Sequence, residues 1–86
     1  MDMIDEELMR LRNRLEDLKM RVIPDFENKT QMLYSQIMSL RKDSPDRQRM
    51  ESEYKNLSGE LSRRSDELIN IKNQIDNLET EKSFRR

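Results

Sequence analysis

The sequence predicts an all-α, elongated coiled coil made of two long helices. Apolar residues recur at alternating intervals of three and four along nearly the whole chain, the spacing of the a and d positions of a heptad. Only 33% of the residues are hydrophobic and 41% are charged, too little apolar surface for a compact globular core. The concentrated helix-breaking signal, Asp43–Asp46, lies near mid-chain. These observations predict a helix, a break and a second helix.

The first segment, residues 1–42, predicts a helix from about Met3 to Arg41. Its a and d positions form an apolar stripe, the helix-pairing seam, which should face another helix. The residues between these positions are mostly charged, as a solvated helix surface requires. The seam of this segment comprises Ile4, Leu8, Leu11, Leu15, Leu18 and Val22, and then Ile23, Phe26, Thr30, Leu33, Ile37 and Leu40.

Pro24 interrupts this first seam. A proline inside a helix removes one backbone donor and clashes with the preceding turn. From Leu18 to Phe26 the interval is eight residues instead of seven, so one residue is skipped. We expect a kink near Pro24 with the chain continuing in the same direction. A short break, with Asp25 helping a new helix to start, is the alternative.

The break covers residues 43–46, and the second heptad-patterned helix covers 45–86, from Pro45 to about Ser83. Ser44 is expected to cap it through its side chain, and Pro45 suits the first helical position. Arg64 is the one polar residue within this seam. Because no helix-stop signal follows, we expect a fragment of a longer coiled-coil protein. The seam of this segment comprises Met50, Tyr54, Leu57, Leu61, Leu68, Ile71, Ile75 and Leu78.

A helix with a narrow apolar stripe needs a partner to be stable in water. The partner is either the other half of this chain, in an antiparallel hairpin, or another chain, in an extended kinked coil; two hairpins could also pair as four helices. In the hairpin Leu40 meets Arg47, and Pro24 falls opposite Arg64. Charges do not decide between these arrangements: the hairpin sets Arg21 favourably near Glu67 but Arg12 unfavourably near Lys72.

Apolar residues outside the seam predict a second contact surface. Tyr34 and Met38 are four residues apart and flank Leu33 and Ile37, which widens the apolar face beyond what one partner helix covers. Together with Phe26 they form a possible partner surface. The flexible, polarizable methionine side chain suits surfaces that accept partners.

Composition excludes several functional classes. Without His or Cys there is neither a recognisable metal site nor a nucleophile–base pair. The sequence also lacks a glycine-rich loop of the kind that binds phosphate groups of cofactors. We therefore expect no catalytic residues, metal or cofactor. A net charge of −1 without an aromatic–basic array argues against nucleic acid, and no apolar run is long enough for a membrane span. The lack of Cys and of a signal peptide predicts a cytoplasmic location.

The leucine-rich seam, the skipped residue and the proline resemble segments of long coiled-coil proteins such as myosin tails, cytoskeletal tethers and intraflagellar-transport scaffolds. The resemblance is generic and involves no diagnostic motif. The predicted function is a non-enzymatic scaffold or oligomerisation segment that assembles partner chains, identical or different, in a cytoskeletal, trafficking or motor-associated assembly. The alternative is an effector or adaptor that docks a folded regulatory protein, such as a small GTPase, on Phe26, Tyr34 and Met38.

Overall fold

The protein is an all-helical rod, seen here in a computed structural model that describes residues 2–84. Its principal extents are 65 × 16 × 14 Å, and the described residues contain no strand. The predicted all-α, elongated fold class is therefore confirmed, whereas the predicted segment ends at residues 1 and 86 lie outside the described residues. In chain order the elements are α1 (Met3–Asp17), the π-helical turn η1 (Leu18–Val22), α2 (Ile23–Ser39) and α3 (Pro45–Phe84).

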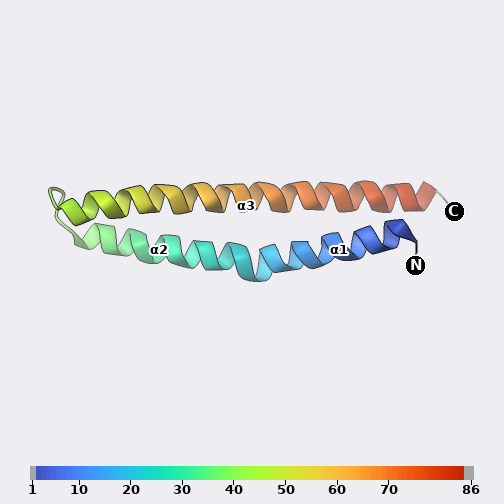
Figure 1. Cartoon of the computed structure of the whole chain (residues 1–86), viewed down its shortest axis with the longest axis horizontal. Helices are drawn as coiled ribbons and strands as arrows, with labels where there is room; N and C mark the ends of the chain where they lie inside the picture. Colours follow the sequence, from blue (N-terminus) through green and yellow to red (C-terminus); the bar gives the residue numbers. More distant parts are fainter. Residues whose placement is uncertain (1, 85–86) are drawn as a thin grey trace.

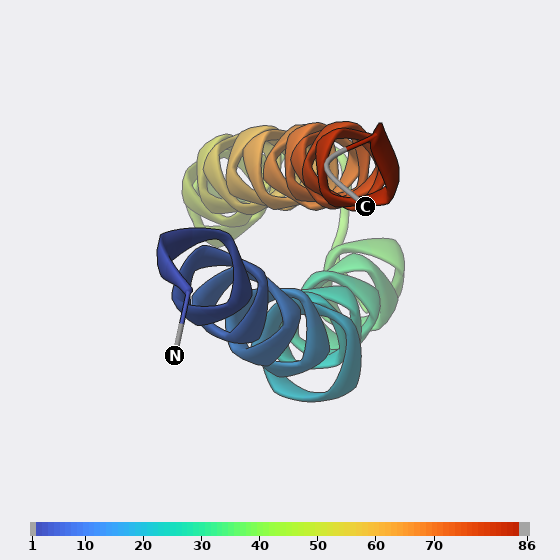
Figure 2. The ribbon, with the colours of Figure 1, turned by 90° about the vertical axis from the view of Figure 1, so that its right-hand side faces the viewer.

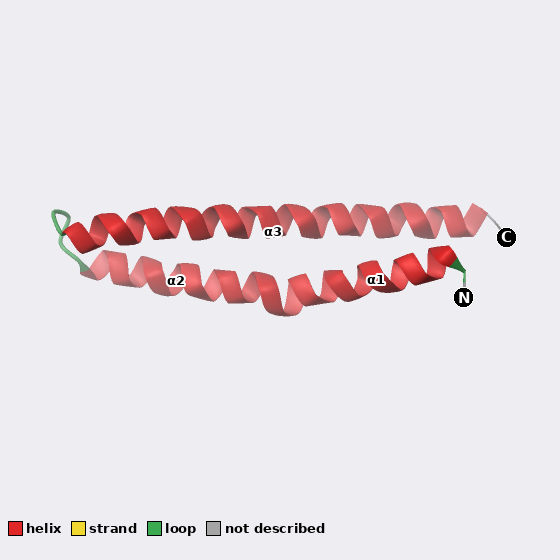
Figure 3. Ribbon diagram, viewed as in Figure 1, coloured by secondary structure: helices red, strands yellow, loops and turns green. Residues whose placement is uncertain are grey.

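The elements form two antiparallel arms joined by a short loop. The first arm is α1, η1 and α2 in sequence, and all three contact α3, which alone makes the second arm (Figures 1 and 3). Viewed end on, the arms cross each other along the rod, because the first arm passes from one side of α3 to the other (Figure 2). Of the two arrangements expected from the sequence, the chain in this structure adopts the hairpin.

The skipped residue before Pro24 is absorbed by η1. Pro24 has no N–H to donate to the preceding turn, and the ladder ahead of it widens, so that the Ile23 amide donates to the Leu18 carbonyl five residues back. One extra residue per turn is what the eight-residue spacing demands. The chain remains helical through Pro24, and the first arm bows away from α3 at this turn (Figure 1).

The loop is closed by Arg47, a contact that agrees with the predicted layer of Leu40 and Arg47. The Arg47 guanidinium donates to the Leu40 carbonyl at 2.9 Å, which satisfies a carbonyl just beyond the end of α2, and to the Glu51 carboxylate at 2.9 Å. At the start of α3 the Ser44 backbone carbonyl accepts from the amides of Arg47 and Gln48, the first hydrogen bonds of the helix, while the cap through the Ser44 side chain stays a prediction.

Burial is uneven along the rod. In the half that holds the chain ends, one cluster of buried side chains joins the arms: Ile4, Leu8, Leu11, Leu18, Ile71 and Ile75, with Leu15, Val22, Ile23, Leu68 and Leu78 packed against it. In the loop half, Leu33 and Ile37 of α2 are buried. Their counterparts on α3 are only half-buried: Met50, Tyr54, Leu57 and Leu61. The two arms cover each other best near the chain ends.

Leu18 should therefore be the most sensitive seam position. It is fully buried in η1, so Leu18→Ala should lower the free energy of unfolding by about 2–5 kcal/mol. Leu57→Ala, at a half-buried position, is the matched control and should cost less. Urea unfolding followed by circular dichroism measures both, and equal losses would contradict the uneven packing.

Candidate functional site

The structure turns the predicted helix-pairing seam inward along both arms. Its members fall into two groups by exposure. The buried group contains Leu8, Leu11, Leu18, Leu33, Ile37, Ile71 and Ile75. The half-buried group contains Leu15, Leu40, Leu57, Leu61, Leu68 and Leu78. The heptad pattern thus identified the residues between the arms, but it could not indicate which layers would close fully.

The predicted partner surface divides into two parts. Tyr34 and Met38 keep 49% and 54% of their surface exposed, although the Tyr34 ring lies 5.9 Å from that of Tyr54 on the other arm. Phe26 is half-buried at the seam, with the Lys29 ammonium 6.0 Å from its ring centre. Tyr34 and Met38 are therefore the accessible part of this surface.

Shallow grooves flank the seam in the loop half, one on each side of the hairpin. The groove on the side of Tyr34 is lined by Glu27, Thr30, Gln31, Tyr34, Tyr54 and Leu61. The groove on the opposite side is lined by Lys29, Met32, Leu33, Gln36, Glu53 and Leu57. In both, half-buried seam residues of α3 remain reachable from outside. The loop half therefore offers apolar surface on two sides.

Within residues 2–84, three ion pairs are seen between the arms, and they differ from those expected. Arg14 holds Glu67 with two hydrogen bonds, of 2.8 and 3.1 Å; the expected partner Arg21, one heptad further along, is instead bound by Asp17 of its own arm. Likewise Arg12, which was expected to face Lys72, forms its ion pair with Glu79. The third pair joins Asp5 to Lys82. The expected partners of Glu67 and Arg12 are thus each replaced by a residue one heptad away.

Glu67 is the centre of the cross-arm charge network. It accepts from Arg14 of the first arm and from Arg64 of its own helix at 3.2 Å, and Arg64 also pairs with Glu60. Arg64, the polar seam residue, is therefore neither buried nor without a partner. The hydrogen bond from Arg14, and then that from Arg64, hold the pKa of the Glu67 carboxyl below its usual value against the opposing effect of burial.

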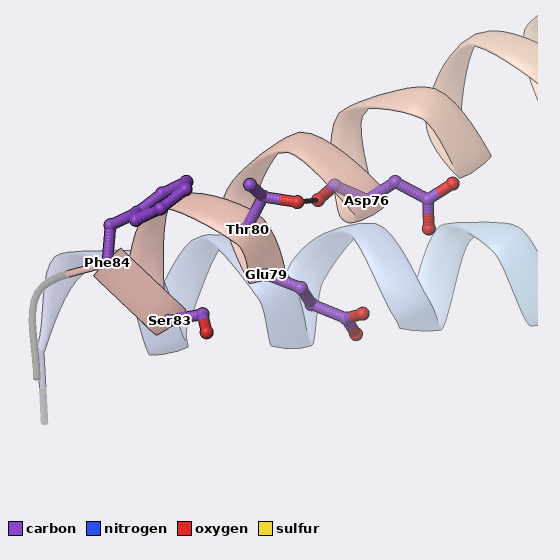
Figure 4. Close-up of a pocket in the computed structure, with 5 residues that line it drawn as sticks. All are labelled: Asp76, Glu79, Thr80, Ser83 and Phe84. Carbon is purple, nitrogen blue, oxygen red and sulfur yellow. Dashed lines mark hydrogen bonds between the residues drawn. The ribbon is translucent and has the colours of Figure 1, made fainter.

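Among the described residues no group of three or more His, Cys, Asp or Glu side chains could hold a metal ion. A depression over the last turns of α3 is lined by Asp76, Glu79, Thr80, Ser83 and Phe84 (Figure 4). There the Thr80 hydroxyl donates to the backbone carbonyl of Asp76 at 2.8 Å, and Phe84 is 83% exposed, so this is open helix surface. In residues 2–84 no helix has a stretch apolar enough to cross a membrane.

In comparisons with protein-family models, curated proteins and solved structures, the chain matches none of them.

Removing the carboxylate of Glu67 should loosen the arms. Glu67→Gln breaks the bidentate ion pair with Arg14 and should lower the free energy of unfolding by up to about 1 kcal/mol. For a chain of this size, that corresponds to a loss of at most about 4–8 °C in melting temperature. Glu79→Gln is the matched control, because its pair with Arg12 is more exposed. Thermal melting followed by circular dichroism decides, and a larger effect of Glu79→Gln would contradict the central place of Glu67.

The same pair predicts an acid-sensitive stability. The pKa of Glu67 is lower in the folded chain than its ordinary value of 4.5, so the folded state binds its proton less readily than the unfolded state. The contribution of the Glu67 carboxylate to the free energy of unfolding is complete above its ordinary pKa. This contribution disappears as the pH falls through the lowered pKa of the folded chain. The difference in melting temperature between wild type and Glu67→Gln should therefore shrink on acidification. A difference that grows with acid would refute this.

Proposed function

We propose that this chain is a non-enzymatic coiled-coil segment that serves as a scaffold or oligomerisation unit. The observation that carries the proposal is the division of its apolar surface. One part of the seam is closed between the arms near the chain ends, and another part, in the loop half, is half-buried and bordered by exposed Tyr34, Met38 and Met32. Apolar residues beyond those that pair the arms are typical of helices that meet further chains.

The hairpin is the assembly unit in this proposal, and the arms pair as a coiled coil through their a and d residues. Its partners are helical chains, identical or different, that lie along the loop half. Heptad spacing on both arms supports this pairing, since it keeps the apolar stripe on one side of each helix over many turns. We place it in a cytoplasmic assembly of cytoskeletal, trafficking or motor-associated type, on the strength of the cysteine-free sequence and the resemblance to long coiled-coil proteins.

A second candidate function is favoured by the exposure of Tyr34 and Met38. In this alternative the hairpin is complete by itself, and the surface of Phe26, Tyr34 and Met38 docks a folded regulatory protein, for instance a small GTPase. Aromatic and methionine side chains are enriched where proteins meet. The two functions differ in whether the chain associates when it is alone.

Thermal melting over about three decades of protein concentration separates these functions. An oligomerisation unit that binds its own kind gains stability by mass action, so its melting temperature should rise with concentration while light scattering reports a mass above that of one chain. The control is Leu18→Ala, which should lower the melting temperature at every concentration without removing the trend. A monomer that melts at one temperature throughout would reject self-assembly and favour the docking function.

A further inference from the structure

One segment of α2 differs in chemistry from the rest of the chain. Residues 30–40 contain no Asp, Glu, Lys or Arg, although 41% of the sequence is charged. This is not a buried core segment, because Met32, Tyr34 and Met38 are each about half exposed or more. A helix that faces water normally carries charges opposite its apolar stripe. Loss of charge together with aromatic and methionine residues is instead typical of the centre of a protein interface.

On the side of Tyr34, this segment lies next to a stripe of α3 that carries charges of both signs. Glu53 lines the groove on the other side of the hairpin. The stripe of α3 at i, i+4 and i+7 from Glu51 therefore borders the side of Tyr34. We call the combined surface the Tyr34 face, and it consists of Gln31, Tyr34 and Met38 of α2 with Glu51, Lys55 and Ser58 of α3.

The order of the charges on α3 makes the Tyr34 face complementary to itself. Tyr34 contacts Tyr54, so the middle of the face lies between Glu51 and Lys55. Consider a two-fold axis through that point that lies in the plane of contact and runs across the rod. It sets two faces together with α3 antiparallel to α3 and α2 antiparallel to α2 of the other copy. It brings each Glu51 opposite the Lys55 of the other copy, and each contact occurs twice, as in every such symmetric interface. On α2 the same axis brings the charge-free segment onto itself, so no like charges meet there.

We propose that the Tyr34 face binds a second copy of this chain, giving a two-fold symmetric dimer of hairpins. The inference rests on the proposed assembly function and names the surface and the partner. Apolar side chains of both copies would cover one another, and the paired Glu51 and Lys55 would fix the register. A second copy presents the same uncharged segment, so no charge would be buried where the two copies of α2 meet.

The size of the face sets the strength of this dimer. The face covers eight residues on each helix, 31–38 and 51–58, which span roughly 12 Å, and two helices are about 20 Å wide, so its footprint is roughly 240 Å² per copy. Stable interfaces bury about 800 Å² per partner. This face is well below that size, so the dimer should be weak and transient.

Charge reversal with mixing tests the proposal by sedimentation equilibrium of the full chain. Lys55→Glu leaves two acidic residues at this position of the face; Glu51→Lys leaves two basic ones and also removes the pair of Glu51 with Arg47 of its own helix. Each variant alone should dimerise about tenfold more weakly than wild type, because like charges then oppose each other twice. An equimolar mixture of the two should recover dimerisation, since every acidic residue again meets a basic one. Glu53→Lys, on the opposite side of the hairpin, is the matched control and should dimerise like wild type.

The result also distinguishes this inference from the proposed function. If wild type associates but Lys55→Glu and Glu51→Lys associate equally well, or their mixture shows no recovery, assembly uses another surface and the inference is wrong while the assembly function stands. If wild type keeps the mass of one chain at every concentration and its melting temperature never changes, both the dimer and self-assembly are rejected. Circular dichroism of each variant confirms that its helices are intact before its mass is compared.

Discussion

The burial of one narrow apolar stripe by another is the constraint on which the rest of this molecule depends. Both arms are rich in charged residues, and neither could stay helical in water unless its apolar stripe were covered. A short loop at residues 40–44 joins the arms, and the second arm returns along the first (Figure 1). Arg47 then closes the turn by bonding Leu40, and the contacts near the chain ends complete the rod.

The π-helical turn η1 reconciles this constraint with an imperfect repeat. The extra residue between Leu18 and Phe26 would rotate the following seam away from α3 if the helix were regular. One widened turn takes up that residue, and it lies immediately before Pro24, where a backbone hydrogen bond is already missing. Leu18 consequently remains fully buried, and Val22 and Ile23, though adjacent in sequence, both pack against the core. A defect in the repeat thus becomes a well-packed layer.

Much of this fold is predictable from the sequence, because helix period, breaker and proline act locally. Spacing alone placed Leu8, Leu11 and Ile75 on the seam, and Ser44–Pro45 marked the break between the helices, but neither decided between a hairpin and an extended coil. What could not be predicted depends on the actual separation and reach of side chains. The choice of Arg14 over Arg21 by Glu67 follows from the flexibility of arginine and from the competing Asp17. Of the three residues predicted to form a partner surface, Tyr34 and Met38 are exposed. Phe26 is half-buried at the seam, and the ammonium of Lys29 lies near its ring.

The hairpin topology also sets how the rod would respond to mechanical force. The ion pair of Asp5 and Lys82 holds the first turns beside the last, so the described chain enters and leaves at one end of a rod 65 Å long. Tension applied through both ends would peel the arms apart layer by layer instead of sliding them past each other. The first layers to open are those of the buried cluster, which includes Ile4, Leu8 and Ile75. The strongest resistance therefore comes at the start of the pull, and the rod would yield abruptly once that end has opened.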